Sequence, residues 1–233
     1  MATVGLGIVL SLSLARWPGV DPVRHASGAQ TAFRFNSYIG LALADRLAGA
    51  EGVAAIALLI ALCVPLCNTA AVWPLARQGG QNYFKELARN PLILATVAGL
   101  LCNLAGLRLP DAAATVMQRI GAAALPLGLM AVGAGLQFGG LKAAWPLAGA
   151  FLTLRHAVLP AFGIALALAL GLPPVQAMVV VAFAALPTAS SAYVLAARMG
   201  GDGPFVAGLV TVSTLLGMVS VPLALAIFGR LSP

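Results

Sequence analysis

Long apolar runs, separated by short polar segments, cover most of this chain and restrict what it can fold into. Of its 233 residues, 61% are hydrophobic and only 8% are charged, and the mean hydropathy is +1.00. A soluble domain carries about 25% charged residues, so this chain has too few charges to cover a surface that faces water. The sequence therefore predicts an all-α integral membrane protein whose solvent is lipid.

The apolar runs predict eight transmembrane helices, of which the first is incomplete. A helix over residues 1–15 would be about 22 Å long, which is shorter than the ~30 Å hydrocarbon core of a bilayer. The segment before the second span contains Arg24 and His25, and we expect it to be a solvated loop. The predicted spans are residues 1–15, 28–48, 53–75, 91–107, 115–138, 144–170, 174–197 and 205–228.

One clearly polar linker, "RQGGQNYFKELARN" at residues 77–90, divides the chain. Lys and Arg are more frequent in cytoplasmic loops, so their distribution orients the spans. If the linker is cytoplasmic, it shares that side with Arg16, Arg24, Lys142 and Arg198, and only Arg46, Arg108, Arg119 and Arg230 face the other side. We therefore predict a cytoplasmic linker between a first unit, residues 1–76, and a second unit, residues 91–233.

The two units contain similar segments on either side of the linker. "ALADRLAGAEG" at Ala42–Gly52 is similar to "VLAARMGGDG" at Val194–Gly203, and each follows a span with polar residues at its middle. By the span count, the second span enters the membrane from the inside and the seventh from the outside. This arrangement is an inverted repeat, which is typical of secondary transporters.

Polar residues interrupt both of these spans near their middle. Pro187 lies about 16 to 20 Å from each end of its span, close to the bilayer midplane. Proline removes a backbone donor and breaks the helix, and the freed carbonyl groups persist only where protein or a water-filled cavity satisfies them. Two broken helices that meet at this depth would form a small polar pocket, although such residues often serve only helix packing. The candidate substrate-binding residues are Asn36, Ser37, Gly40, Pro187, Thr188, Ser190 and Ser191.

Arg155 and His156 form another exceptional pair, because they lie well inside the sixth span. Arg155 is about 14 Å past the start of that span, where a charge is costly and usually functional. It either balances the charge of an anionic substrate or extends toward an interface. His156 either couples transport to protons or is a packed helix residue.

Three classes of function fit a membrane protein with polar residues inside its spans: a secondary carrier, an intramembrane enzyme and a non-transporting scaffold. An enzyme would need a nucleophile with a base, or metal ligands, at depth, but the Asp and Glu residues lie at the ends of spans. We therefore expect no enzyme activity, no cofactor and no metal. The +7 net charge is scattered, so no nucleic-acid partner is expected either. A carrier for a small anion, embedded in a lipid bilayer, is the favoured class.

Several segments of the chain resemble the auxin efflux carrier family of membrane transporters, in its bacterial branch. They are in the order of the family and extend over essentially the whole chain. The segments are "FRFNSYIGLAL" at Phe33–Leu43, "NPLILATVAGLLCNLAGLRLP" at Asn90–Pro110, "ALPLGLMAVGAGL" at Ala124–Leu136, "ALPTASSAYVLAARMGGD" at Ala185–Asp202 and "TVSTLLGMVSVPL" at Thr211–Leu223.

The resemblance implies ten helices in two inverted five-helix repeats, with two broken helices that cross. It also implies a small organic anion as substrate, such as malonate, malate or an auxin-like carboxylate. The implied location is a bacterial inner membrane. H⁺ or Na⁺ as a coupling ion and a second copy in a homodimer are further candidate partners, which the sequence does not decide. Relative to this plan the chain lacks helices at its N-terminus, so a truncated protein without transport activity is the alternative. Ala42 stands where the family often has proline, so the first break is expected to be less sharp.

Overall fold

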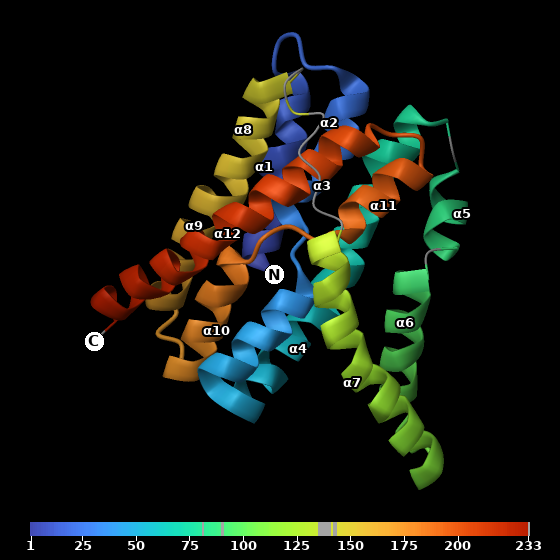
Figure 1. Ribbon diagram of the computed structural model, residues 1–233, viewed down its shortest axis with the longest axis vertical. Coiled ribbons are helices and arrows are strands. Elements are labelled where there is room, and N and C mark those ends of the chain that lie inside the picture. The colour runs from blue at the N-terminus through green and yellow to red at the C-terminus, as the bar shows by residue number, and fades with distance from the viewer. Residues whose placement is uncertain (81, 90, 135–140, 142–143, 233) are drawn as a thin grey trace.

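The computed structural model describes residues 1–233 except 81, 90, 135–140, 142–143 and 233, and every regular element in the described part is a helix. Figure 1 shows the arrangement of these helices. The elements of the first part are α1 (Ala2–Ser13), a 3₁₀ turn (Leu14–Arg16), α2 (Pro22–Gly28), α3 (Gln30–Phe33), α4 (Ser37–Gln78), α5 (Tyr83–Ala88), α6 (Pro91–Leu104) and α7 (Asp111–Ala134). Those of the second part are α8 (Trp145–Thr153), a π-helical turn (Leu154–Val158), α9 (Leu159–Ala169), α10 (Pro174–Ala185), α11 (Ser191–Arg198) and α12 (Gly203–Leu231).

Three helical segments in the described part of the chain are long and apolar enough to cross a membrane: Pro22–Gln78, Trp145–Ala169 and Gly203–Leu231. Ala2–Arg16 and Pro174–Ala185 are apolar but shorter. The prediction of an all-helical membrane protein is thus confirmed, while the count of eight spans and the inverted-repeat plan remain predictions. The end of the predicted fifth span, residues 135–138, lies outside the described residues.

The expected loop before the second span is wrong in its second half, because α2 already begins at Pro22. The Asp21 side chain accepts a hydrogen bond from Arg24 N at 2.8 Å, and proline occupies the first turn. Aspartate at the N-cap followed by proline is a favoured helix start. His25 is therefore buried rather than solvated, and its Nε2 lies 2.9 Å from Ser11 O.

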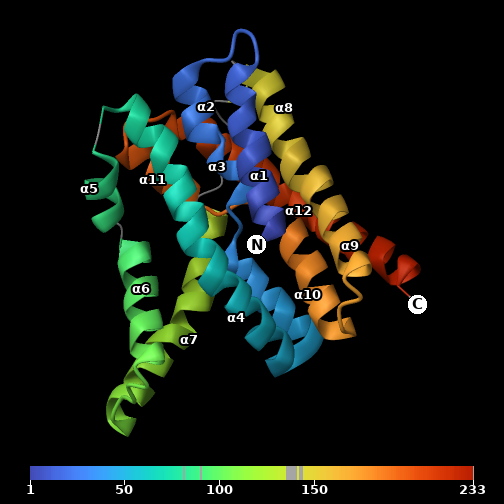
Figure 2. The same ribbon diagram turned by 180° about the vertical axis from the view of Figure 1, so that it is seen from behind.

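The second predicted span is broken at residues 34–36, where the backbone leaves the helical conformation between α3 and α4. After the break α4 has two arms, residues 37–47 and 50–78, which join at a turn through Gly49 with φ 55° and ψ −141°. A residue with a side chain would be strained at this positive φ, whereas glycine adopts it freely. The turn folds the two arms of α4 back on each other, as Figure 2 shows.

The seventh predicted span is broken in the same way, which confirms the expected interruption at Pro187. α10 ends at Ala185, α11 starts at Ser191, and residues 186–189 between them are not helical. α10 packs against α4, α9 and α12, so the second break is held inside the bundle. A cluster of buried apolar residues from α1, α4 and α10 surrounds both breaks.

α6 and α7 pack against α4 and lie on the side of the molecule opposite α8 and α9 (Figures 1 and 2). Many apolar residues on their described surfaces are exposed, such as Leu101, Leu104 and Ile120, as expected of helices in lipid. α5, in the predicted linker, is joined to α11 by an ion pair between Glu86 Oε2 and Arg198 Nη2 at 3.2 Å. The described part of the linker is thus short and helical.

Candidate functional site

The two breaks touch each other through their backbones. Asn36 N donates a hydrogen bond to Pro187 O at 2.9 Å, although the two residues are far apart in the sequence. The side chain of Asn36 caps α4, because its Oδ1 accepts hydrogen bonds from Tyr38 N at 3.1 Å and Ile39 N at 3.2 Å. The backbone N–H, the carbonyl and the side-chain oxygen of Asn36 are thus all paired, and Asn36 satisfies one carbonyl of the second break, which lies between α10 and α11 in Figure 1.

Close approach of the two broken helices depends on Gly40, one turn after the first break. A Cβ atom at this position would lie 2.9 Å from Leu186 Cδ1 and 3.0 Å from Ile56 Cδ1. These distances are shorter than ordinary van der Waals contacts, so the side chains of Leu186 and Ile56 would have to shift to admit a larger residue. Gly40 is thus a packing residue of the crossing point.

We expect Asn36→Ala to destabilise the folded protein by about 1 kcal/mol, because alanine cannot accept from the first two free amides of α4. The bond from Asn36 N to Pro187 O uses the backbone and remains possible in the variant. Equilibrium unfolding in mixed micelles measures the effect, and Asn36→Asp is the matched control that keeps the cap. Equal loss of stability in both variants would contradict a capping role.

A small cavity lies at the crossing point and has a volume of about 140 Å³. Drug-sized ligands occupy pockets of about 300–1,000 Å³, so this cavity suits a small solute. Both helices that follow the breaks present their first residues to it, Ser37 of α4 and Ser191 of α11. The lining residues are Arg34, Phe35, Ser37, Tyr38, Val64, Cys67, Asn68, Ala189 and Ser191.

Arg34 supplies a buried positive charge at this cavity. Its side chain is only 5% exposed, and it donates from Nη1 to Gln30 Oε1 at 3.0 Å and from Nη2 to Ser191 Oγ at 2.9 Å. Neither ion pair among the described residues involves it, since these join Arg24 to Asp202 and Arg198 to Glu86. A buried charge without a countercharge is costly, so the site is electrostatically suited to an anion.

Asn68, from the long arm of α4, adds an unused donor. The residue is 1% exposed, and its Nδ2 has no hydrogen-bond partner within the described part of the chain. A buried amide nitrogen without a partner costs about 1–3 kcal/mol, which a ligand oxygen would recover. The polar groups that line the cavity are therefore a guanidinium, an amide and hydroxyl groups, with no carboxylate among the described lining residues.

Arg155 lies beside the second break but does not line the cavity. Its guanidinium donates from Nε to Leu186 O at 2.5 Å and from Nη2 to Phe183 O at 3.5 Å, and the residue is 2% exposed. These carbonyls belong to the C-terminal end of α10, where the helix dipole favours a positive charge. Its observed partners are thus backbone carbonyls, and the expected role in balancing a substrate charge remains a prediction.

The remaining predicted residues are distributed around the cavity. Thr188 is fully buried, and its backbone N–H donates to Ser213 Oγ at 3.0 Å. Ser190 is the N-cap residue of α11 and makes no capping bond with its side chain. His156 lies in the π-helical turn and is bound to α12 rather than to the cavity. Of the predicted substrate-binding residues, Ser37 and Ser191 therefore line the cavity. The cavity lining does not include Asn36, Gly40, Pro187 or Thr188.

The sequence prediction missed the two most polar residues of the cavity, Arg34 and Asn68. Arg34 is a charged residue inside the predicted span 28–48, and charged residues within a span are candidates for function. Asn68 is likewise a polar residue inside the predicted span 53–75. The same criterion that selected Arg155 would have selected Arg34.

Comparison with known proteins gives one family. A family model described as a membrane transport protein matches residues 38–225, which include the second break and begin just after the first break, residues 34–36. No curated protein sequence matches the chain at a significant level.

Proposed function

Because the chain belongs to the membrane transport protein family that includes the auxin efflux carriers, a family of transporters, we propose that it is a secondary carrier for a small organic anion. In this proposal the 140 Å³ cavity at the crossing point is the substrate site. The observation that carries it is the buried guanidinium of Arg34, which has no countercharge among the described residues and lines this cavity.

The proposed mode of binding uses three kinds of donor. The carboxylate of the substrate accepts from Arg34 in a charge-assisted hydrogen bond. The amide of Asn68 offers a second bond on the other side of the cavity. The N-terminal ends of α4 and α11 carry partial positive charge, and Ser37 and Ser191 at these ends face the cavity.

The substrate class follows from this charge and size. We propose a small carboxylate such as malonate or malate, or an auxin-like carboxylate, carried together with H⁺ or Na⁺. The chain is a multi-pass membrane protein, and we extend the proposal to a bacterial inner membrane and to a homodimer. Movement of the two broken helices relative to their neighbours would expose the cavity to one side at a time.

Uptake into liposomes tests the proposal. Purified protein reconstituted with an inward anion gradient is expected to accumulate radiolabelled malonate, malate or indole-3-acetate with saturation, while a choline cation probe is not accumulated. Empty liposomes and liposomes with heat-inactivated protein are the controls. Flux that equals the empty liposomes for all three anions, in either direction of the gradient, would instead favour a membrane protein that does not transport.

A further inference from the structure

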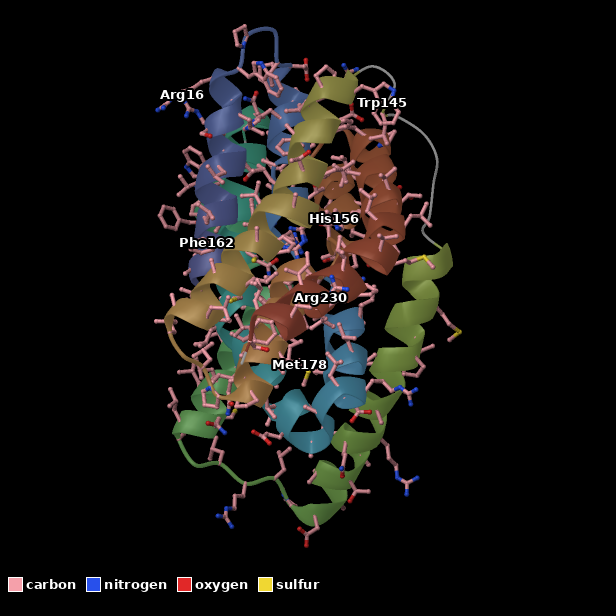
Figure 3. All side chains as sticks on the ribbon, turned by 90° about the vertical axis from the view of Figure 1, so that its left-hand side faces the viewer. Arg16, Trp145, His156, Phe162, Met178 and Arg230 are labelled. Carbon is pink, nitrogen blue, oxygen red and sulfur yellow. The ribbon has the colours of Figure 1, made fainter. Side chains whose placement is uncertain are left out.

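His156 is held at both of its ring nitrogens by one face of α12. Nε2 lies 2.8 Å from Ser213 Oγ, and Nδ1 lies 2.8 Å from Ser220 Oγ, two helical turns further along α12. The residue belongs to the π-helical turn 154–158 between α8 and α9, and such turns are frequent at functional sites. Figure 3 shows it about midway between Trp145, at one end of the molecule, and Met178, toward the other end.

The hydrogen bonds continue from His156 to the second break. Ser213 Oγ accepts the backbone N–H of Thr188 at 3.0 Å, so one hydroxyl joins the imidazole to the residue after Pro187. Ser213 has a single proton to donate, and within the described residues His156 Nε2 is the only acceptor it contacts. In the tautomer that our proposal uses, Ser213 donates to Nε2, and the neutral ring carries its proton on Nδ1, from which it donates to Ser220.

We propose that His156 binds a proton and is a positioning residue, which controls the second break through Ser213. A proton added at Nε2 makes both ring nitrogens donors, so Ser213 can no longer donate to the ring. Its hydroxyl must then turn toward another acceptor. Thr188 Oγ1 is such an acceptor, because it is buried without a hydrogen-bond partner among the described residues and belongs to the residue that Ser213 already binds.

The charges around His156 link this proton to an anion in the cavity. Arg155 is adjacent on the same turn, and Arg230, ten residues beyond Ser220, is the other charged residue of the helices that pack there. These helices, α1, α3, α8, α9 and α12, contain no Asp, Glu or Lys within their bounds. Protonation thus adds positive charge beside Arg155, in a bundle that also holds the buried charge of Arg34 at the cavity, and an anion relieves the repulsion.

The linkage between the proton on His156 and an anion in the cavity rests on the proposed function, whereas the proton-dependent change at Thr188 does not. Binding linkage is reciprocal, so a proton on His156 should favour the anion as much as the anion favours the proton. The ring is half-buried and lines a groove between α9 and α12, so it is accessible from outside the buried core. Ala189, the residue after Thr188, lines the cavity. A change in the hydrogen bonds of Thr188 therefore acts directly next to the cavity wall.

The first test follows the amide of Thr188 by NMR in protein labelled with ¹⁵N-threonine, with the signal assigned by its loss in Thr188→Ser. Between about pH 8 and about pH 3, a range that extends well below the ordinary histidine pKa of ~6.5, the shift is expected to titrate in the wild type. The titration should vanish in His156→Gln and in Ser213→Ala. The chain has only two histidines, so His25→Gln is the matched control and should keep it. A flat wild-type profile, or titration that persists in His156→Gln, would overturn the proposal.

The second test measures the affinity for malonate across the same pH range. We expect binding at low pH to be about fivefold or more tighter in the wild type than in His156→Gln, and the variant is the reference because malonate itself gains a proton in this range. A pH profile equal to that of His156→Gln while the Thr188 signal titrates would refute the linkage to the site. If no anion binds at any pH, the proposed function fails, and the Thr188 titration still decides the role of His156.

Discussion

Arg34→Gln is expected to lower the affinity for malonate, or for whichever carboxylate is transported, by about 100-fold or more. Truncating one partner of a buried, hydrogen-bonded charge pair costs about 2–5 kcal/mol, and a factor of 100 corresponds to ~2.8 kcal/mol. The side chain lines the cavity and carries the one positive charge among its described lining residues. Equilibrium binding of the radiolabelled anion to the purified protein measures the effect.

The same substitution should change the free energy of unfolding little. In the unliganded protein, the charge of Arg34 is buried without a countercharge from the described residues, so its removal relieves a desolvation cost that offsets the lost hydrogen bonds to Gln30 Oε1 and Ser191 Oγ. Arg34→Lys keeps the charge and is expected to retain part of the affinity. Arg16→Gln is the matched control, because Arg16 is exposed at the end of the first helix. Wild-type affinity in Arg34→Gln would show that the cavity does not bind the anion through this residue.

Arg155→Met is expected to destabilise the protein, with a loss of about 1–3 kcal/mol in the free energy of unfolding. Methionine keeps an apolar stem but leaves the carbonyl of Leu186 without its donor, whereas Phe183 O still accepts from Leu186 N, and a buried unpaired polar group costs about 1–3 kcal/mol. Equilibrium unfolding in mixed micelles measures this difference.

Arg16→Met provides the comparison for Arg155→Met, and its effect should stay within about 0.5 kcal/mol because the side chain is exposed. If Arg155→Met is as stable as the wild type, the carbonyls of the second break have another partner. Together, these two outcomes would separate a residue that binds the ligand, as proposed for Arg34, from one that stabilises the backbone, Arg155.

The sequence by itself determined the helical membrane character of the chain and the position of the second break. Long apolar runs with few charges predict helices in lipid, since a helix pairs its backbone groups internally. Proline at position 187 has no backbone N–H to donate and weakens a helix, although Pro65 and Pro222 lie inside continuous helices of the same structure. Both features depend only on neighbouring residues, which is why they could be recognised without the structure.

The tertiary structure decided which polar groups meet. Asn36 binds Pro187, and Arg34 binds Ser191 over 157 residues of sequence, and no local pattern specifies such pairs. The same holds for the separate roles of the two buried arginines, because a charge inside an apolar run marks a constrained site but does not identify its partner. His25 shows the reverse case, in which a residue expected in solvent is buried because α2 begins earlier than the apolar run. Hydropathy is a sum over neighbours along the chain, whereas a binding site is built from contacts between segments that only the packing of the helices brings together.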